Sequence, residues 1–166
     1  MPDDLGPPIR PFDAAAATDH VAIGHLQSIY ADVVNRRAWN ELGGIFVDDA
    51  EVVIDTVTSA PVALTGPEEF GSFVSDAMER FEFLEFVILS SRIELAPDGD
   101  DDHASARLYM CEIRRDVGTL DWSTAYGVYH DRYVRTPDGW RFARRDYRSL
   151  TRTDGEVFPF PHQLGF

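Results

Sequence analysis

Five side chains in this sequence could move a proton or stabilise a negative charge, and they are spread over most of the chain. They are Tyr30, Asn35, Asp55, His130 and Arg144. A carboxylate or an imidazole can accept a proton, a phenol or an amide can donate a hydrogen bond to a developing oxyanion, and a guanidinium can bind an anion. In one pocket, these groups could remove a proton from a carbon atom beside a carbonyl group.

Two of these residues are candidate bases. Asp55 lies in the apolar segment "EVVIDTV", where burial would raise its pKa and suit it to proton abstraction; an exposed position at the end of a strand is the alternative. His130 lies in the aromatic segment "YGVYHDRYV", and alternation places it on one face with Trp122, Tyr126 and Val128. Its alternative role is to hold a neighbouring strand or an interface.

The other candidates would bind the substrate. Helical spacing directs Tyr30 toward the interior, where its phenol could polarise a substrate oxygen or simply fill the core. Trp140, Phe142 and Arg144 alternate along the last predicted strand, so we expect all three to point inward and Arg145 to point outward. A buried Arg144 needs an anion, which would be either a substrate group or an internal aspartate.

The sequence predicts neither a metal nor a cofactor. Cys111 is the single cysteine, which excludes an internal disulfide and a cysteine-based zinc cluster. The acidic run "DGDDD" at 98–102 lacks the closing glutamate of a calcium-binding loop. No glycine-rich phosphate loop follows a predicted strand.

Composition limits the partners. The 166 residues carry a net charge of −14 and are 44% hydrophobic, which suits one domain with one core. The negative charge argues against binding to nucleic acid or to an anionic membrane surface. Because there is no long apolar run, no signal peptide and no cysteine pair, we expect a cytoplasmic protein whose partner is a small hydrophobic molecule.

Periodicity predicts helices first and long strands afterwards. Helical segments are expected at about 20–36, 38–46 and 65–81, and a strand lies between the last two. Four strand-like segments follow at about 83–95, 103–116, 121–136 and 139–150. This order predicts an α+β fold, in which a strongly curved, mostly antiparallel sheet forms a cone closed by about three helices.

Three regions are expected along the chain. Residues 1–17 are rich in proline and lack periodicity, so we interpret them as a flexible N-terminal arm. Residues 18–152 form the domain. The tail, residues 153–166, contains three phenylalanines and is too apolar to remain in water, so we expect it to pack on the body or on a neighbour.

Four segments carry a resemblance to a known family. They are "YADVVNRRAW", "ELGGIFVDDAEV", "TGPEEFGSFV" and "DGWRFARRDY". In this order and spacing they resemble the SnoaL-like domains of the nuclear-transport-factor-2-like (NTF2-like) superfamily. The resemblance implies the cone-shaped fold. It also implies a choice of activities, which include dehydratases, isomerases, polyketide cyclases, a dehydrochlorinase and small subunits of ring-hydroxylating dioxygenases.

The resemblance also shows a departure at the expected catalytic pair. Dehydratase-like members use an aspartate at the end of the first helix and a histidine on a later strand. Those positions correspond here to Asn35 and Phe86, so both would line a substrate pocket without acting as bases.

Three functions remain open at this stage. The first is a cofactor-independent isomerase, cyclase or dehydratase, with Asp55 or His130 as the base and Tyr30 assisting. The second is a non-catalytic ligand-binding or assembly domain, and the third is a small subunit of a dioxygenase-like complex. In each case we expect a homodimer, with a trimer as the next choice.

Overall fold

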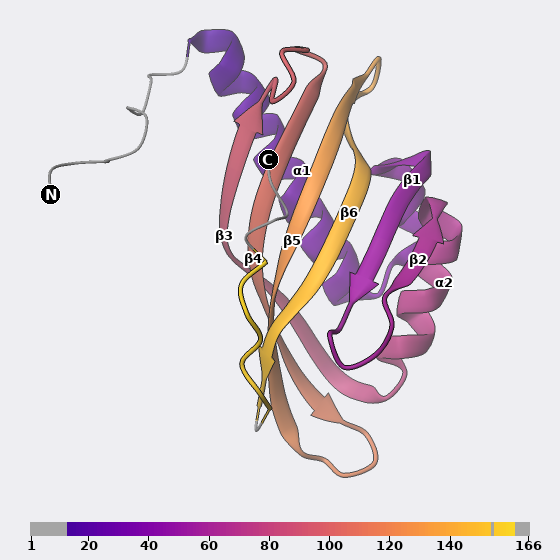
Figure 1. The fold of residues 1–166 in the computed structure, drawn as a ribbon. Coiled ribbons are helices and arrows are strands. Elements are labelled where there is room, and N and C mark those ends of the chain that lie inside the picture. Colours follow the sequence, from indigo (N-terminus) through magenta and orange to yellow (C-terminus); the bar gives the residue numbers. More distant parts are fainter. Residues whose placement is uncertain (1–12, 154, 162–166) are drawn as a thin grey trace, which may run out of the picture.

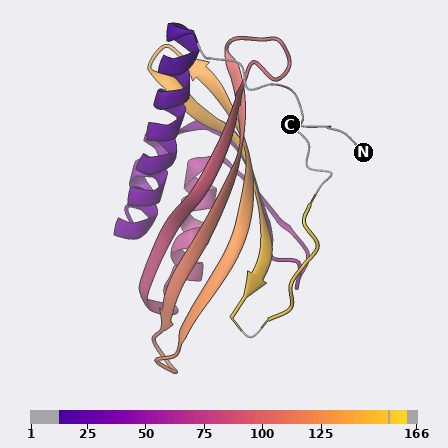
Figure 2. The same cartoon turned by 90° about the vertical axis from the view of Figure 1, so that its left-hand side faces the viewer.

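The computed structural model describes residues 13–153 and 155–161. A six-stranded, curled sheet carries its helices on one face (Figures 1 and 2). The helical elements are α1 (Ala14–Arg36), the short 3-10 helix η1 (Trp39–Gly44) and α2 (Gly66–Met78). Among the described residues, none of these helices has both the length and the apolar character needed to cross a membrane.

Helix α1 begins earlier than periodicity suggested. The side chain of Asp13 caps its first turn, because Oδ1 accepts a hydrogen bond from Ala16 N at 2.8 Å. Alanines at 14–17 are strong helix formers, so the last four residues of the predicted arm are helical. The rest of that arm, residues 1–12, lies outside the described part of the chain. The helix ends where Arg37 adopts a left-handed conformation, φ 55°.

The strands run in the spatial order β2-β1-β6-β5-β4-β3. Their bounds are β1 Phe46–Asp55, β2 Val62–Thr65, β3 Phe81–Leu95, β4 His103–Asp116, β5 Trp122–Thr136 and β6 Gly139–Arg152. The β1–β6 pair is parallel and the other pairs are antiparallel. The expected α+β fold with a mostly antiparallel, curved sheet is confirmed. The short strand β2 was not predicted.

A bulge in β6 changes which side chains point inward. Tyr133 pairs with Phe142, but Arg132 pairs with Arg144, so one extra residue, Ala143, is inserted in β6. A bulge reverses the alternation beyond it. Trp140 and Phe142 are therefore buried on the helix side as expected, whereas Arg145 is fully buried and Arg144 is not. The expectation that Arg144 points inward and Arg145 outward is wrong for this reason.

The core forms between the helices and the inner face of the sheet, around the ring of Tyr30. The rings of Phe86 and Phe142 lie 5.5 and 5.8 Å from it, centroid to centroid. Trp140 and Phe142 belong to this core, and Trp140 Nε1 donates a hydrogen bond to Asp19 Oδ1 at 3.1 Å.

The segment after β6 runs along the outer face of the sheet, opposite the helices (Figure 2). Phe158 N donates to Leu150 O at 2.8 Å, and the ring of Phe160 stacks on that of Tyr109, with centroids 6.2 Å apart. Part of the predicted aromatic tail therefore contacts the body of the same chain. Residue 154 and residues 162–166 of the tail lie outside the described part.

Candidate functional site

A cavity of about 220 Å3 lies between the helices and the curled sheet. Most of its wall is apolar, with residues from α1, α2, β1 and β3. They include Val52, Ile54, Phe70, Phe73, Val74 and Phe86. A concave, mainly apolar site with a few polar groups is the usual form of a small-molecule site.

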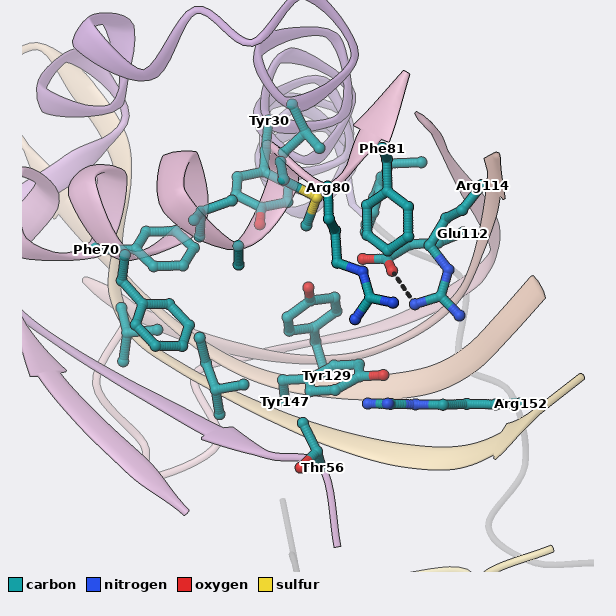
Figure 3. Close-up of a pocket in the computed structure, with 18 residues that line it drawn as sticks. Tyr30, Thr56, Phe70, Arg80, Phe81, Glu112, Arg114, Tyr129, Tyr147 and Arg152 are labelled. Carbon is teal, nitrogen blue, oxygen red and sulfur yellow. Dashed lines mark ion pairs between the residues drawn. The ribbon is translucent and has the colours of Figure 1, made fainter. Parts of the chain in front are cut away.

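The polar groups of the cavity are concentrated on one side. Figure 3 shows Glu112 with Arg80, Arg114 and Arg152 at one end, and aromatic and aliphatic side chains at the other. Tyrosine hydroxyls lie between these two regions. The site can therefore hold an apolar group and contact a polar one at the same time.

Glu112, on β4, is the acidic residue among those that line the cavity. Its side chain is 15% exposed, and one carboxylate oxygen lies 3.6 Å from Arg114 Nη1. Burial raises the pKa of this carboxyl group, and the charges of Arg114 and Arg152 oppose that rise without cancelling it. A buried carboxylate with a raised pKa is suited to accept a proton near neutral pH.

Two buried phenols face the same space. Figure 3 shows the hydroxyls of Tyr30, from α1, and Tyr129, from β5, turned toward the cavity. Burial raises the pKa of Tyr30 and raises that of Tyr129 well above its usual value. Both phenols therefore keep their protons and can donate hydrogen bonds to a bound oxygen.

A buried cation supports these two phenols from behind. The guanidinium of Arg145 lies 3.9 Å from the ring centroid of Tyr30 and 4.0 Å from that of Tyr129. Arg145 Nε and Nη2 donate to Asp131 at 2.8 and 3.0 Å. Tyr133 also donates to Asp131, at 2.9 Å. This network holds the two rings in place at the floor of the cavity.

Tyr147, on β6, completes the polar middle of the cavity. It lies against β5 at Gly127, where the Cβ of any other residue would collide with the Tyr147 ring. Burial raises the pKa of this tyrosine too, and the charge of Glu112 adds to the effect. The glycine therefore makes room for a ring that lines the site.

Asp55 does not line the cavity. Its neighbours Ile54 and Thr56 do, and alternation turns Asp55 to the outer face. There its Oδ2 accepts from Arg148 Nη1 at 2.5 Å, and its Oδ1 accepts from Val57 N at 2.8 Å. The sequence left the direction of Asp55 open, and the structure places its side chain on the outer face, away from the cavity where a base would act.

His130 also points to the outer face of the sheet. Its Nε2 accepts from Arg107 Nε at 3.3 Å, and burial lowers its pKa, with a further contribution from Arg107. Tyr129 and Tyr133 of β5 point to the opposite, inner face, where their rings pack against Tyr30 and Phe142. Trp122, which was expected on the same face as His130, is 58% exposed. His130 therefore does not reach the cavity.

The side chain of Asn35 forms hydrogen bonds with the backbone of Phe86. Asn35 Nδ2 donates to Phe86 O at 3.1 Å, and Asn35 Oδ1 accepts from Phe86 N at 2.6 Å. The amide therefore ties the end of α1 to strand β3 and does not line the cavity. The ring of Phe86 does line it, as does Tyr30.

Arg144 pairs on the outer face with Glu51 and with Asp146, whose Oδ2 lies 2.9 Å from Arg144 Nε. It is 40% exposed and lies away from the cavity. Of the residues predicted to bind substrate, Phe86 contacts the cavity, whereas Trp140 and Phe142 are core residues beside it.

Alternation in the sequence around Glu112 indicates its inward direction. In the segment "RLYMCEIRR", Leu108 and Met110 are apolar and alternate with Arg107 and Tyr109. This alternation places Glu112 on the same inward face as Leu108 and Met110, and both of these are fully buried. Arg152 lies after the last predicted strand, so its contribution to the site could not be read from that strand.

The described residues contain no group of three or more histidine, cysteine, aspartate or glutamate side chains that could hold a metal ion. The donors around Glu112 are guanidinium groups, which repel cations.

The sequence model of the SnoaL-like domain family matches residues 15–146 of this chain. This chain belongs to the SnoaL-like domain family. The match covers α1 and the strands through the first half of β6, so it includes most of the residues that form the cavity. Among curated proteins, none matches the sequence significantly.

Solved structures show the same NTF2-like fold. A scytalone dehydratase-like protein from Novosphingobium aromaticivorans matches with a TM-score of 0.72 and 22% identity, over 86% of this chain and 91% of that one. Hexachlorocyclohexane dehydrochlorinase LinA-type3 from Novosphingobium barchaimii matches with a TM-score of 0.71 and 22% identity, over 87% and 97%. At this level of identity the likeness is one of fold.

Proposed function

We propose that this SnoaL-like protein is a cofactor-independent isomerase, cyclase or dehydratase that acts on a small, mainly apolar molecule by proton abstraction. The observation that supports this proposal is the position of Glu112. Its carboxylate, with a raised pKa, shares an apolar cavity with the phenols of Tyr30 and Tyr129. In this proposal the base is Glu112. It replaces Asp55 and His130, which were the candidate bases from the sequence.

The proposed reaction needs one base and one oxyanion site. Glu112 accepts a proton from the carbon beside a carbonyl group, and the electron pair of the broken C–H bond forms an enolate. Tyr30 and Tyr129 donate hydrogen bonds to the enolate oxygen. In an isomerisation, protonated Glu112 returns the proton to a different carbon. In an elimination, the enolate expels a group from the neighbouring carbon, and Glu112 later releases the proton to water.

Hydrogen–deuterium exchange tests the proton step without knowledge of the product. Cyclic ketones are incubated with the protein in D2O, and loss of the α-proton signal is followed by NMR. We expect Glu112→Gln to slow the exchange by about 100-fold or more, as expected for loss of a general base. Glu85→Gln, at an exposed position of β3, is the matched control and should keep the wild-type rate. Equal rates in wild type and Glu112→Gln would exclude Glu112 as the base.

A non-catalytic binding domain is the second candidate, and the amide of Asn35 favours it. Both polar atoms of Asn35 bind the backbone of Phe86, so the position of the family's aspartate has a structural role here. In this case a ligand binds the cavity with similar affinity in wild type and Glu112→Gln, and neither protein catalyses exchange. Calorimetric titration alongside the exchange assay separates the two functions.

We propose that the protein acts as a homodimer. Large apolar side chains are exposed near the hairpin between β4 and β5, where Leu120 is 51% and Trp122 58% exposed. The ring of Phe83 packs on Trp122 at 5.4 Å, and such a patch is typical of an interface. Light scattering should give the mass of a dimer for the wild type and of a monomer for Trp122→Ser.

A further inference from the structure

The charged end of the cavity adjoins a second hollow. Arg80, Phe81, Arg114 and Arg152 line both the cavity and an outer cleft of about 250 Å3. A molecule whose apolar part fills the cavity would therefore place its remaining end among these guanidinium groups. Figure 3 shows the three arginines gathered on this side.

The arginines at this junction have unused hydrogen-bond donors. Arg114 Nε and Arg152 Nε are buried and have no hydrogen-bond partner. The guanidinium of Arg114 is also held in place, because it lies 5.2 Å from the ring centroid of Phe81. Buried donors without partners are costly, and an acceptor on a ligand would satisfy them.

The charges at the inner side of the junction do not balance. Arg114 and Arg152 face the single carboxylate of Glu112 within the cavity lining. The outer cleft also contains Asp116 and Asp121, but the Asp116 carboxylate is held by Gly118 N at 2.8 Å and pairs with Arg80 at 3.2 Å. On the inner side, Arg114 and Arg152 therefore exceed the one carboxylate of Glu112, in a protein whose net charge is −14.

We propose that the ligand is a small carboxylic acid. Its carboxylate binds Arg114 and Arg152 at the charged end of the cavity, and its apolar body lies in the cavity. A planar carboxylate can take two hydrogen bonds from one guanidinium. This inference names the substrate class of the same site and so rests on the proposed function.

The volume of the cavity limits the apolar body. An apolar cavity of about 150 Å3 in another protein holds benzene, so about 220 Å3 has room for a single ring with small substituents. The ligand is therefore a one-ring carboxylic acid, aromatic or alicyclic.

Calorimetric titration of the full chain tests the inference with matched ligands. The probes are benzoate and cyclohexanecarboxylate, each compared with its neutral carboxamide. We expect each acid to bind the wild type at least about tenfold more tightly than its amide, because two charge-assisted hydrogen bonds are lost in the amide. Arg152→Gln and Arg114→Gln should each weaken acid binding by about tenfold and leave amide binding unchanged.

Arg92→Gln is the control, since Arg92 is an exposed arginine of β3 and its loss changes the net charge equally. It should bind the acids as the wild type does. Arg152→Gln is the second test if Arg114→Gln fails to fold, which circular dichroism would show.

The possible outcomes separate this inference from the proposed function. If amides bind as tightly as acids, or if the arginine variants bind acids normally, the anion site is overturned but an apolar ligand site remains. If neither acids nor amides bind, the cavity is not a site for such molecules and both proposals fail. If acids bind selectively and exchange is absent, the anion site stands and the catalytic proposal falls.

Discussion

The side-chain amide of Asn35 faces two backbone groups of Phe86, at a residue that the sequence resemblance aligned with the aspartate of dehydratase-like proteins. The amide N–H of Asn35 meets a carbonyl, and its carbonyl meets an N–H. An aspartate could accept the hydrogen bond from Phe86 N, but its second carboxylate oxygen would face the Phe86 carbonyl oxygen. The residue is therefore suited to join α1 to β3.

We expect Asn35→Asp to lower the free energy of unfolding by about 1–3 kcal/mol at neutral pH, because it leaves the Phe86 carbonyl unpaired and facing a negative charge. The loss should shrink in acid, where the new carboxyl can donate a proton. Chemical denaturation at several pH values measures both effects. Asp32→Asn, on the exposed face of the same helix, should change stability little. A stable Asn35→Asp at neutral pH would contradict the proposed role of the amide.

The raised pKa of Glu112 predicts how stability depends on pH. In the unfolded chain this carboxyl releases its proton around its ordinary pKa of 4.5, whereas the folded protein keeps the proton to higher pH. Between the pKa of the unfolded chain and the higher pKa of the folded protein, the folded state therefore binds an extra proton. The stability gained from binding this proton is lost as pH rises. Glu112→Gln cannot ionise and lacks this loss.

We therefore expect the melting temperature of the wild type to fall relative to that of Glu112→Gln as pH rises above 4.5 and through the raised pKa of Glu112. Thermal melts of the two proteins over a pH series measure the difference. A difference that stays constant with pH, or that has the opposite sign, would show that Glu112 is not held in a destabilising environment.

At the scale of the elements, the bulge at Ala143 determines which arginine of β6 faces the interior. It brings Arg145 beneath the rings of Tyr30 and Tyr129 and turns Arg144 to the outer face. Without the extra residue, β6 would present Arg144 to the interior. A single inserted residue thus exchanges the environments of two adjacent arginines.

This exchange predicts very different costs for two similar substitutions. Arg145→Gln leaves Asp131 buried without its ion-pair partner, so we expect a loss of roughly 3–5 kcal/mol in unfolding free energy. Arg144→Gln breaks a half-exposed pair and should cost no more than about 1 kcal/mol. Urea denaturation of both variants measures the costs. A larger cost for Arg144→Gln than for Arg145→Gln would contradict the inward position of Arg145.

At the scale of the whole molecule, the two faces of the sheet have different roles. The inner face carries the core and the cavity, and the outer face carries ion pairs and the segment after β6. Phe160 contacts Tyr109 on this outer face, and the guanidinium of Arg107 lies 5.5 Å from the Phe160 ring centroid. The C-terminal segment therefore covers apolar surface of its own chain.

We expect Phe160→Ala to lower the free energy of unfolding by about 0.5–1.5 kcal/mol, the usual contribution of an aromatic pair. It should also speed hydrogen exchange or proteolysis of the segment after β6. Val157→Ala is the matched control, because Val157 is 81% exposed and loses little contact. Equal behaviour of the two variants would mean that the segment is not held by Phe160.

The sequence by itself determined the order of the elements, the α+β class and the family, because periodicity and turn residues are local properties. It also placed Tyr30 and Phe86 correctly in the cavity wall. The directions of Asp55, His130 and Arg144 could not be read in this way. They depend on strand register and on a bulge that arises only when strands pair, and a shift of one residue moves a side chain to the other face. Tertiary structure alone brought Glu112 from β4, Arg152 from β6 and Tyr30 from α1 to one cavity, because burial and pKa depend on neighbours that are distant in the chain.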